Sequence, residues 1–185
     1  MGKSFGRTKA EYHLFACIAS AMMTALAVVL ERILAINTQV VKIGFSFAPI
    51  VMIALLFGPI YAALTAGLAD LIGALLLPTG TFFPGFTITA VLVGLCYGLF
   101  LQRAFDKKHR FLRILIPTLI NNFVFGLTVN TLLISLYFSD KGFWPLFVLR
   151  LSTQYAFLIP MNLILIPVLM RVAKLLYPKI GGAVA

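Results

Sequence analysis

Long apolar runs alternate along this chain with short breaks of charged residues, proline and glycine. A helix needs about 20 mostly apolar residues to cross the hydrocarbon core of a bilayer. When the chain is divided at these breaks and each run is compared with that length, six helical segments are predicted. They lie at about Tyr12–Ile36, Phe45–Phe57, Ile60–Leu77, Phe86–Arg103, Phe111–Phe138 and Phe147–Tyr177. The second segment is short and meets the third at Gly58 and Pro59, a pair that ends helices, so we expect a tight turn there. No run alternates apolar and polar residues, which argues against a β-barrel.

Composition agrees with this pattern. Of the 185 residues, 62% are hydrophobic and only 11% are charged, far outside the range of soluble domains. The first apolar run is too long for a removable signal peptide, so we expect the N-terminus to be retained. The sequence therefore predicts an all-α fold, a single domain over residues 1–185 that forms a bundle of six transmembrane helices in the cell membrane.

The basic residues predict the orientation of the bundle, because short cytoplasmic loops retain lysine and arginine. Eleven of the fifteen fall on one side, before the first helix, between the fourth and fifth, and at the end of the chain. Both termini are therefore expected to be cytoplasmic, with the loops around Thr38, Thr81 and Lys141 outside. The net charge of +10 then reflects topology and contact with lipid headgroups, and nucleic-acid binding is not expected.

Asp70 is the one carboxylate inside a Gly- and Ala-rich apolar segment. An ionisable group at that depth costs about 2.5 to 3.5 kcal/mol on insertion scales, so it indicates either a functional site or a buried polar contact between helices. Arg32 and Arg150 fall near the outer ends of the first and sixth helices, and Gln154 shares a helical face with Arg150. The two guanidinium groups are candidates to clamp an anion. The alternatives are that they extend to the membrane interface, or that Arg32 pairs with Glu31 or another helix.

A polar face and an aromatic surface extend this set. Asn122, Gly126 and Asn130 repeat every four residues along the fifth helix, and polar faces in lipid point toward other helices or a water-filled cavity. Hydrogen bonding between helices is the alternative. Aromatic residues gather in the predicted external loops and at the start of the second helix, and an interfacial belt is their alternative explanation. They are Phe45 and Phe47 at that start, Phe82, Phe83 and Phe86 in one loop, and Phe143 and Trp144 in another. Together these features suit a planar, anionic, aromatic ligand.

The first helix carries small residues in two four-residue rows. One row is Ala16, Ser20 and Thr24, and the other is Cys17, Ala21 and Ala25. Such rows let helices approach closely in lipid. Packing within the protein is the simplest use of both rows.

One stretch of sequence resembles a known family. The short length, the six helices, the Ala21 and Ala25 pair and the run LFGPIYAALTAGLADLIGALLLPTGTFFPGFTITA are similar to the substrate-binding S components of energy-coupling factor (ECF) vitamin transporters, above all to their folate-specific branch. The resemblance implies a subunit that captures a vitamin from outside and topples against a separate transmembrane coupling subunit, which two cytoplasmic ATPases drive. It also implies that Ala21 and Ala25 face that partner. The chain has no phosphate-binding loop motif, so ATP would be used by the partner subunits and no cofactor is expected here.

The resemblance makes folate the expected ligand. Its glutamate tail would take charge-assisted hydrogen bonds from Arg32 and Arg150. The edge of its pterin would be read by Asp70, Asn122 or Asn130, and its ring faces would pack on aromatic side chains. The full candidate set for the substrate is Arg32, Phe47, Asp70, Phe83, Asn122, Asn130, Trp144, Arg150 and Gln154.

Two other functions compete with this one. The chain could serve another vitamin such as pantothenate, or it could be a stand-alone secondary transporter, although its halves show no repeat and few groups suit ion coupling. An enzyme is not expected, because no convergent set of acids, bases, nucleophiles or metal ligands is evident.

Overall fold

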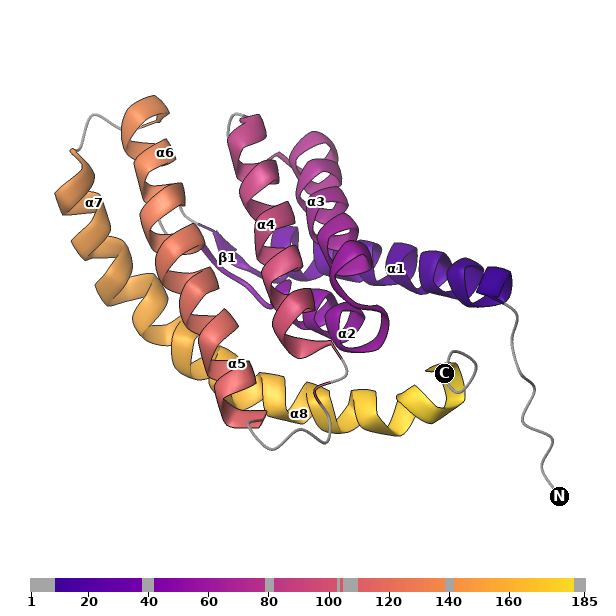
Figure 1. Ribbon diagram of the computed structural model, residues 1–185. Helices are drawn as coiled ribbons and strands as arrows, with labels where there is room; N and C mark the ends of the chain where they lie inside the picture. Colours follow the sequence, from indigo (N-terminus) through magenta and orange to yellow (C-terminus); the bar gives the residue numbers. More distant parts are fainter. Residues whose placement is uncertain are drawn as a thin grey trace, which may run out of the picture.

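The computed structural model describes residues 9–37, 42–78, 82–102, 104, 110–138 and 142–181. Its first half contains α1 (Lys9–Arg32), the two-residue strands β1 (Ile36–Asn37) and β2 (Lys42–Ile43), α2 (Phe47–Phe57), α3 (Pro59–Leu76) and α4 (Pro84–Leu101). The second half contains α5 (Arg110–Leu119), the π-helical segment η1 (Ile120–Val129) and α6 (Asn130–Tyr137), followed by α7 (Phe143–Arg150), the π-helical segment η2 (Leu151–Tyr155) and α8 (Ala156–Gly181). Figure 1 shows these elements as a helical bundle.

Five stretches of helix in the described residues are long and apolar enough to cross a membrane. They are Lys9–Arg32, Pro59–Leu76, Pro84–Leu101, Phe111–Tyr137 and Ala156–Tyr177, and the shorter apolar helix α2 accompanies them. The prediction of a membrane helical bundle is confirmed. The loop positions Thr38, Thr81 and Lys141, on which the predicted topology depends, lie outside the described residues.

Several predicted boundaries are wrong. The first helix ends at Arg32 and not at Ile36, because Ile36 and Asn37 pair antiparallel with Ile43 and Lys42. A strictly all-α fold therefore misses one small hairpin. Helix α7 begins at Phe143, four residues before the predicted start at Phe147, so Trp144 lies on a helix and not in a loop. Pro84 starts α4 two residues earlier than predicted, which is the position where proline fits a helix best.

Helix α2 forms the centre of the bundle. Every residue from Pro49 to Phe57 is buried, and α2 contacts α1, α3, α4 and α8. Eleven residues extend for only about 16 Å, too short to span a bilayer. A uniformly apolar helix of this kind is stable because other helices surround it on all sides.

Glycines allow the helices beside α2 to approach closely. Gly58 joins α2 to α3 with φ at +90°, a conformation that side chains rarely adopt, and this confirms the tight turn. A Cβ on Gly94 would lie 2.5 Å from the carbonyl oxygen of Ala62, and one on Gly98 would overlap the backbone of Pro59. The backbones of α3 and α4 therefore touch at positions where only glycine fits.

Candidate functional site

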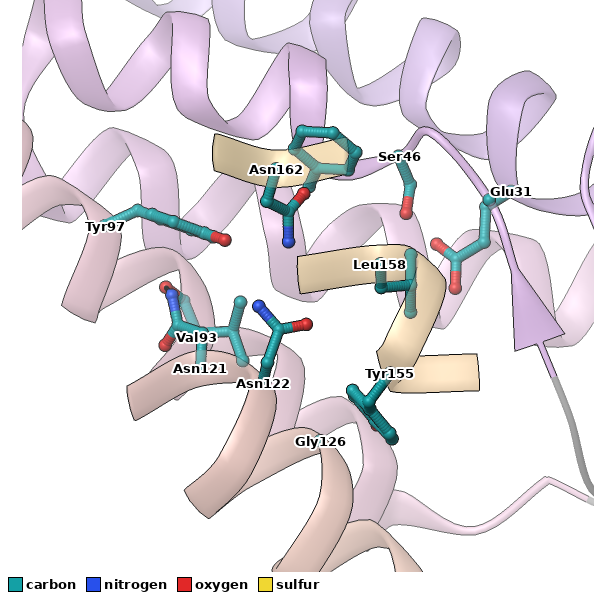
Figure 2. Close-up of a pocket in the computed structure, with 12 residues that line it drawn as sticks. Glu31, Ser46, Val93, Tyr97, Asn121, Asn122, Gly126, Tyr155, Leu158 and Asn162 are labelled. Atoms are coloured by element: carbon teal, nitrogen blue, oxygen red, sulfur yellow. Dashed lines mark hydrogen bonds between the residues drawn. The ribbon is translucent and has the colours of Figure 1, made fainter. Parts of the chain in front are cut away.

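A cavity opens between the two halves of the bundle. Its accessible volume is about 190 Å³, below the roughly 300 to 1,000 Å³ that is usual for small-molecule sites, and it is partly open to the outside. The residues around it come from the end of α1, the segment before α2 and helices α2, α4, η1, η2 and α8; they are Glu31, Gly44, Ser46, Phe47, Val93, Tyr97, Asn121, Asn122, Gly126, Tyr155, Leu158 and Asn162. Figure 2 shows the polar ends of Tyr97, Asn122 and Asn162 converging on one space.

Amide groups provide the hydrogen-bonding capacity of this cavity. Asn121 donates from Nδ2 to the carbonyl oxygen of Val93 at 3.3 Å, and Asn122 donates from Nδ2 to that of Thr118 at 2.7 Å. The Oδ1 atoms of Asn121 and Asn162 are buried, and within the described part of the chain they have no hydrogen-bond partner. A buried acceptor without a donor costs about 1 to 3 kcal/mol. Both side chains line the cavity, so these two oxygens are candidate acceptors for hydrogen bonds from a ligand.

Aromatic side chains supply apolar surface around these amides. Phe47, Tyr97 and Tyr155 all line the cavity, and Tyr97 and Tyr155 are otherwise buried. A flat ring inserted between such walls gains about 0.5 to 1.5 kcal/mol from each well-placed aromatic pair. Among the described residues no group of three metal-ligating side chains occurs. The cavity is thus suited to a planar organic ligand that carries hydrogen-bond donors.

The fold, the helical spans and this cavity can be compared with known proteins. A profile described as "ECF transporter, substrate-specific component" matches residues 16–177, which is most of the chain. The chain belongs to this family. The family consists of transporter subunits and not of enzymes, and the resemblance seen in the sequence is confirmed.

Individual relatives of this S component agree. It is 34% identical over 149 residues to the folate transporter FolT of Clostridium novyi (strain NT), covering 80% of this chain and 84% of that protein. It is 30% identical over 150 residues to the FolT of Leuconostoc mesenteroides subsp. mesenteroides, covering 80% and 76%. A crystal structure of FolT bound with folic acid superposes with a TM-score of 0.68 at 28% identity, over 89% of this chain and 93% of that one.

Of the residues that the sequence suggested for substrate binding, Phe47 and Asn122 line the cavity of this S component. Asn130 does not, although it was placed on the same face as Asn122. The reason is the intervening segment η1, whose π-helical turns are wider than α-helical turns, so a four-residue repeat drifts around the helix. The buried Oδ1 of Asn130 also has no hydrogen-bond partner in the described residues.

Arg32 and Asp70 meet each other outside the cavity lining. Arg32 Nη2 lies 3.7 Å from Asp70 Oδ1, and Thr87 donates from Oγ1 to Asp70 Oδ2 at 2.7 Å. This network joins α1, α3 and α4. A contact between helices was the alternative to ligand binding that the sequence left open for Arg32 and for Asp70. The structure shows this contact for both residues.

The remaining candidates lie elsewhere. Arg150 is buried against Thr131 and Tyr155 and is separate from the contacts of Arg32. Phe83 packs its ring against Phe86, Tyr137 and Phe138, and so joins the start of α4 to the end of α6. Trp144 is 72% exposed and contacts Phe143 and Phe147. The side chain of Gln154 lies outside the described residues.

Sequence reasoning missed several residues that line the cavity, among them Glu31, Tyr97, Asn121, Tyr155 and Asn162. Asn162 carried a usable signal, since it is a single polar residue in a long apolar run, as Asp70 is. Asn121 and Tyr155 carried none, because their directions depend on the π-helical segments that contain them.

The two small-residue rows of α1 differ in exposure. Ala16, Ser20 and Thr24 are buried against the bundle, whereas Cys17, Ala21 and Ala25 are exposed. The first row therefore supports packing within this S component, and the second presents a shallow surface outward.

Proposed function

We propose that this S component is the folate-binding subunit of an ATP-driven ECF importer in the bacterial plasma membrane. It captures folate from the extracellular side in the cavity between α4, η1, η2 and α8. The observation that carries the proposal is a pair of cavity-lining asparagines, Asn121 and Asn162, whose buried Oδ1 atoms have no hydrogen-bond partner among the described residues. The relatives named as folate transporters and the similar structure bound with folic acid support the choice of ligand.

The chemistry of a pterin fits these oxygens. Its 2-amino group and its N3–H are hydrogen-bond donors, and each needs an acceptor when it leaves water. Asn121 Oδ1 and Asn162 Oδ1 are available to them, while Phe47, Tyr97 and Tyr155 offer surfaces for the ring. A ligand without such donors would leave both oxygens unsatisfied, and sites of this kind discriminate strongly against it.

The ligand roles suggested by the sequence for Arg32, Asp70, Phe83, Asn130, Trp144, Arg150 and Gln154 remain predictions. Glu31 lies beside Arg32 in the sequence and lines the cavity, so the end of α1 and the cavity are adjacent. We keep Arg32 as a candidate for the carboxylates of the tail.

Transport would need partners. We propose that the S component topples against a transmembrane coupling subunit and that two cytoplasmic ATPases supply the energy, with both termini of this chain in the cytoplasm. The exposed row that contains Ala21 and Ala25 supports this division of labour, because small side chains on a helix surface permit close contact with another helix in lipid.

Two measurements test the proposal. Calorimetric titration of the detergent-solubilised chain alone should show binding of folate and 5-formyl-tetrahydrofolate, but not of pantothenate or thiamine. Binding of pantothenate or thiamine in place of the folates would contradict the choice of ligand. In proteoliposomes, folate uptake should require the coupling subunit, the ATPases and ATP. Uptake by this chain alone would instead show a stand-alone secondary transporter.

A further inference from the structure

Arg150 is held inside the bundle by contacts with two hydroxyl groups. It is only 4% exposed, and it donates from Nη1 to Thr131 Oγ1 at 2.9 Å and from Nη2 to the hydroxyl oxygen of Tyr155 at 3.4 Å. Its Cζ also lies 5.7 Å from the centre of the Tyr155 ring. A buried guanidinium is costly unless its donors are used, so such contacts fix the position of both partners. Arg150 therefore holds Tyr155 at the hydroxyl and at the ring.

Tyr155 contacts Arg150 and also lines the cavity. Tyr155 lines the cavity, and Arg150 is not among the residues that do. Tyr155 is 3% exposed, and within the described part of the chain its hydroxyl accepts from Arg150 and donates to no other group. A displacement of this ring would change the shape of the cavity wall.

Gly126 makes room for Tyr155 from the other side. A Cβ on Gly126 would lie 2.5 Å from the Tyr155 hydroxyl oxygen and 3.0 Å from its Cε1 atom. Figure 2 shows the two residues next to each other at the edge of the cavity. They lie on η1 and η2, which contact each other, and π-helical segments are frequent at functional sites. The position of the Tyr155 ring thus depends on two residues: Gly126, which has no side chain to displace it, and Arg150, which contacts it.

We propose that Arg150 is a positioning residue of the ligand cavity: it sets the place of the Tyr155 ring in the cavity wall, and with it the affinity for ligand, without contacting the ligand itself. This inference rests on the proposed folate function. It differs from an anion clamp, in which Arg150 would bind the carboxylates of the folate tail directly. The two roles predict different responses to substitution.

The first test displaces the ring without changing Arg150. Gly126→Ala should weaken folate binding by about tenfold, because the added methyl group pushes Tyr155 out of place. Tyr155→Phe removes the hydroxyl to which Arg150 donates, so Y155F should also weaken folate binding, and the double variant G126A/Y155F should lose little more than G126A because both changes displace the same ring. Gly142→Ala is the matched control, since nothing lies within 4 Å of a Cβ at that position. It should bind folate as the wild type does. Unchanged affinity in G126A or in Y155F would overturn the proposal.

The second test separates positioning from a clamp. Arg150→Lys keeps the charge and loses the planar fork that reaches both hydroxyls. If Arg150 acts through Tyr155, R150K should weaken the binding of folate and of pteroic acid, which lacks the glutamate, by the same factor. A loss confined to folate would show a direct clamp on the tail and would refute positioning. If R150K does not fold in detergent, as judged by gel filtration, Y155F decides in its place, because it removes the hydroxyl contact of Arg150 and should weaken folate and pteroic acid equally.

Titration of the wild-type protein separates a failure of the proposed folate function from a failure of the proposed role of Arg150. Wild-type protein that binds none of the folates contradicts the proposed function, and the positioning role falls with it. Wild-type protein that binds folate, with variants that do not follow the expected pattern, contradicts only the role of Arg150.

Discussion

Arg32 and Asp70 form an ion pair between α1 and α3, with 3.7 Å between Nη2 and Oδ1. Gly73 lies one helical turn after Asp70, and a Cβ there would come within 2.7 Å of Arg32 Nε. The guanidinium of Arg32 therefore packs against α3 at Gly73, where the absence of a side chain leaves space for it. This relationship explains how a charged residue of each helix is accommodated between apolar helices.

Breaking this pair should reduce stability. Asp70→Ala leaves Arg32 buried without its carboxylate, and such a change costs about 3 to 5 kcal/mol. We expect a clear fall in the melting temperature in detergent. Asp70→Asn should lose less, because an amide oxygen still accepts the hydrogen bond of Thr87. If instead D70N melted as the wild type does and no longer bound folate, Asp70 would read the ligand directly, as the sequence suggested.

Removing a prepared acceptor should separate affinity from stability. Asn162→Leu deletes a buried oxygen that has no donor among the described residues, so the melting temperature should stay the same or rise. Folate affinity should fall by about tenfold or more, because one pterin donor loses its acceptor. Calorimetry and thermal melting measure the two effects.

Thr65→Val is the matched control for Asn162→Leu. Thr65 Oγ1 is also buried without a partner in the described residues, but Thr65 does not line the cavity. Its substitution should leave folate affinity unchanged. A fall in stability of N162L with full affinity for folate would instead show that Asn162 serves packing alone.

Bulk on the exposed face of α1 should impair transport and spare binding. Ala21→Trp and Ala25→Trp fill the shallow row, which would prevent close approach of a partner helix. We expect folate binding by the isolated chain to be unchanged, while co-purification with the coupling subunit and ATP-driven uptake are lost. Leu175→Trp, at a position that is 74% exposed on α8, should leave both intact. Normal uptake by the two alanine variants would place the partner on another surface.

The contact between α3 and α4 should not tolerate a side chain at position 98. Gly98→Ala places a methyl group on the backbone of Pro59, and overpacking of this kind costs about 1 to 3 kcal/mol. The melting temperature in detergent should fall. Gly142→Ala, which meets no neighbour, should melt as the wild type does.

Much of the fold could be predicted because its determinants are local. The length of an apolar run decides whether it can span a bilayer, and Gly58 with Pro59 ends a helix wherever it occurs. The shortness of α2 was therefore visible, although its central position was not. The hairpin of β1 and β2 was not predicted, because strands of only two residues are too short to show an alternating pattern in the sequence.

The sequence by itself determined that this protein is a membrane helical bundle of the S component family, since hydropathy and one specific run of residues carry that information. Only the tertiary structure decided which polar groups meet. In the structure Arg32 pairs with Asp70, Arg150 contacts Tyr155, and Asn121 and Asn162 line one cavity. These directions follow from the π-helical turns of η1 and η2 and from the packing of helices distant in sequence, and neither is encoded in the spacing of residues along a regular helix.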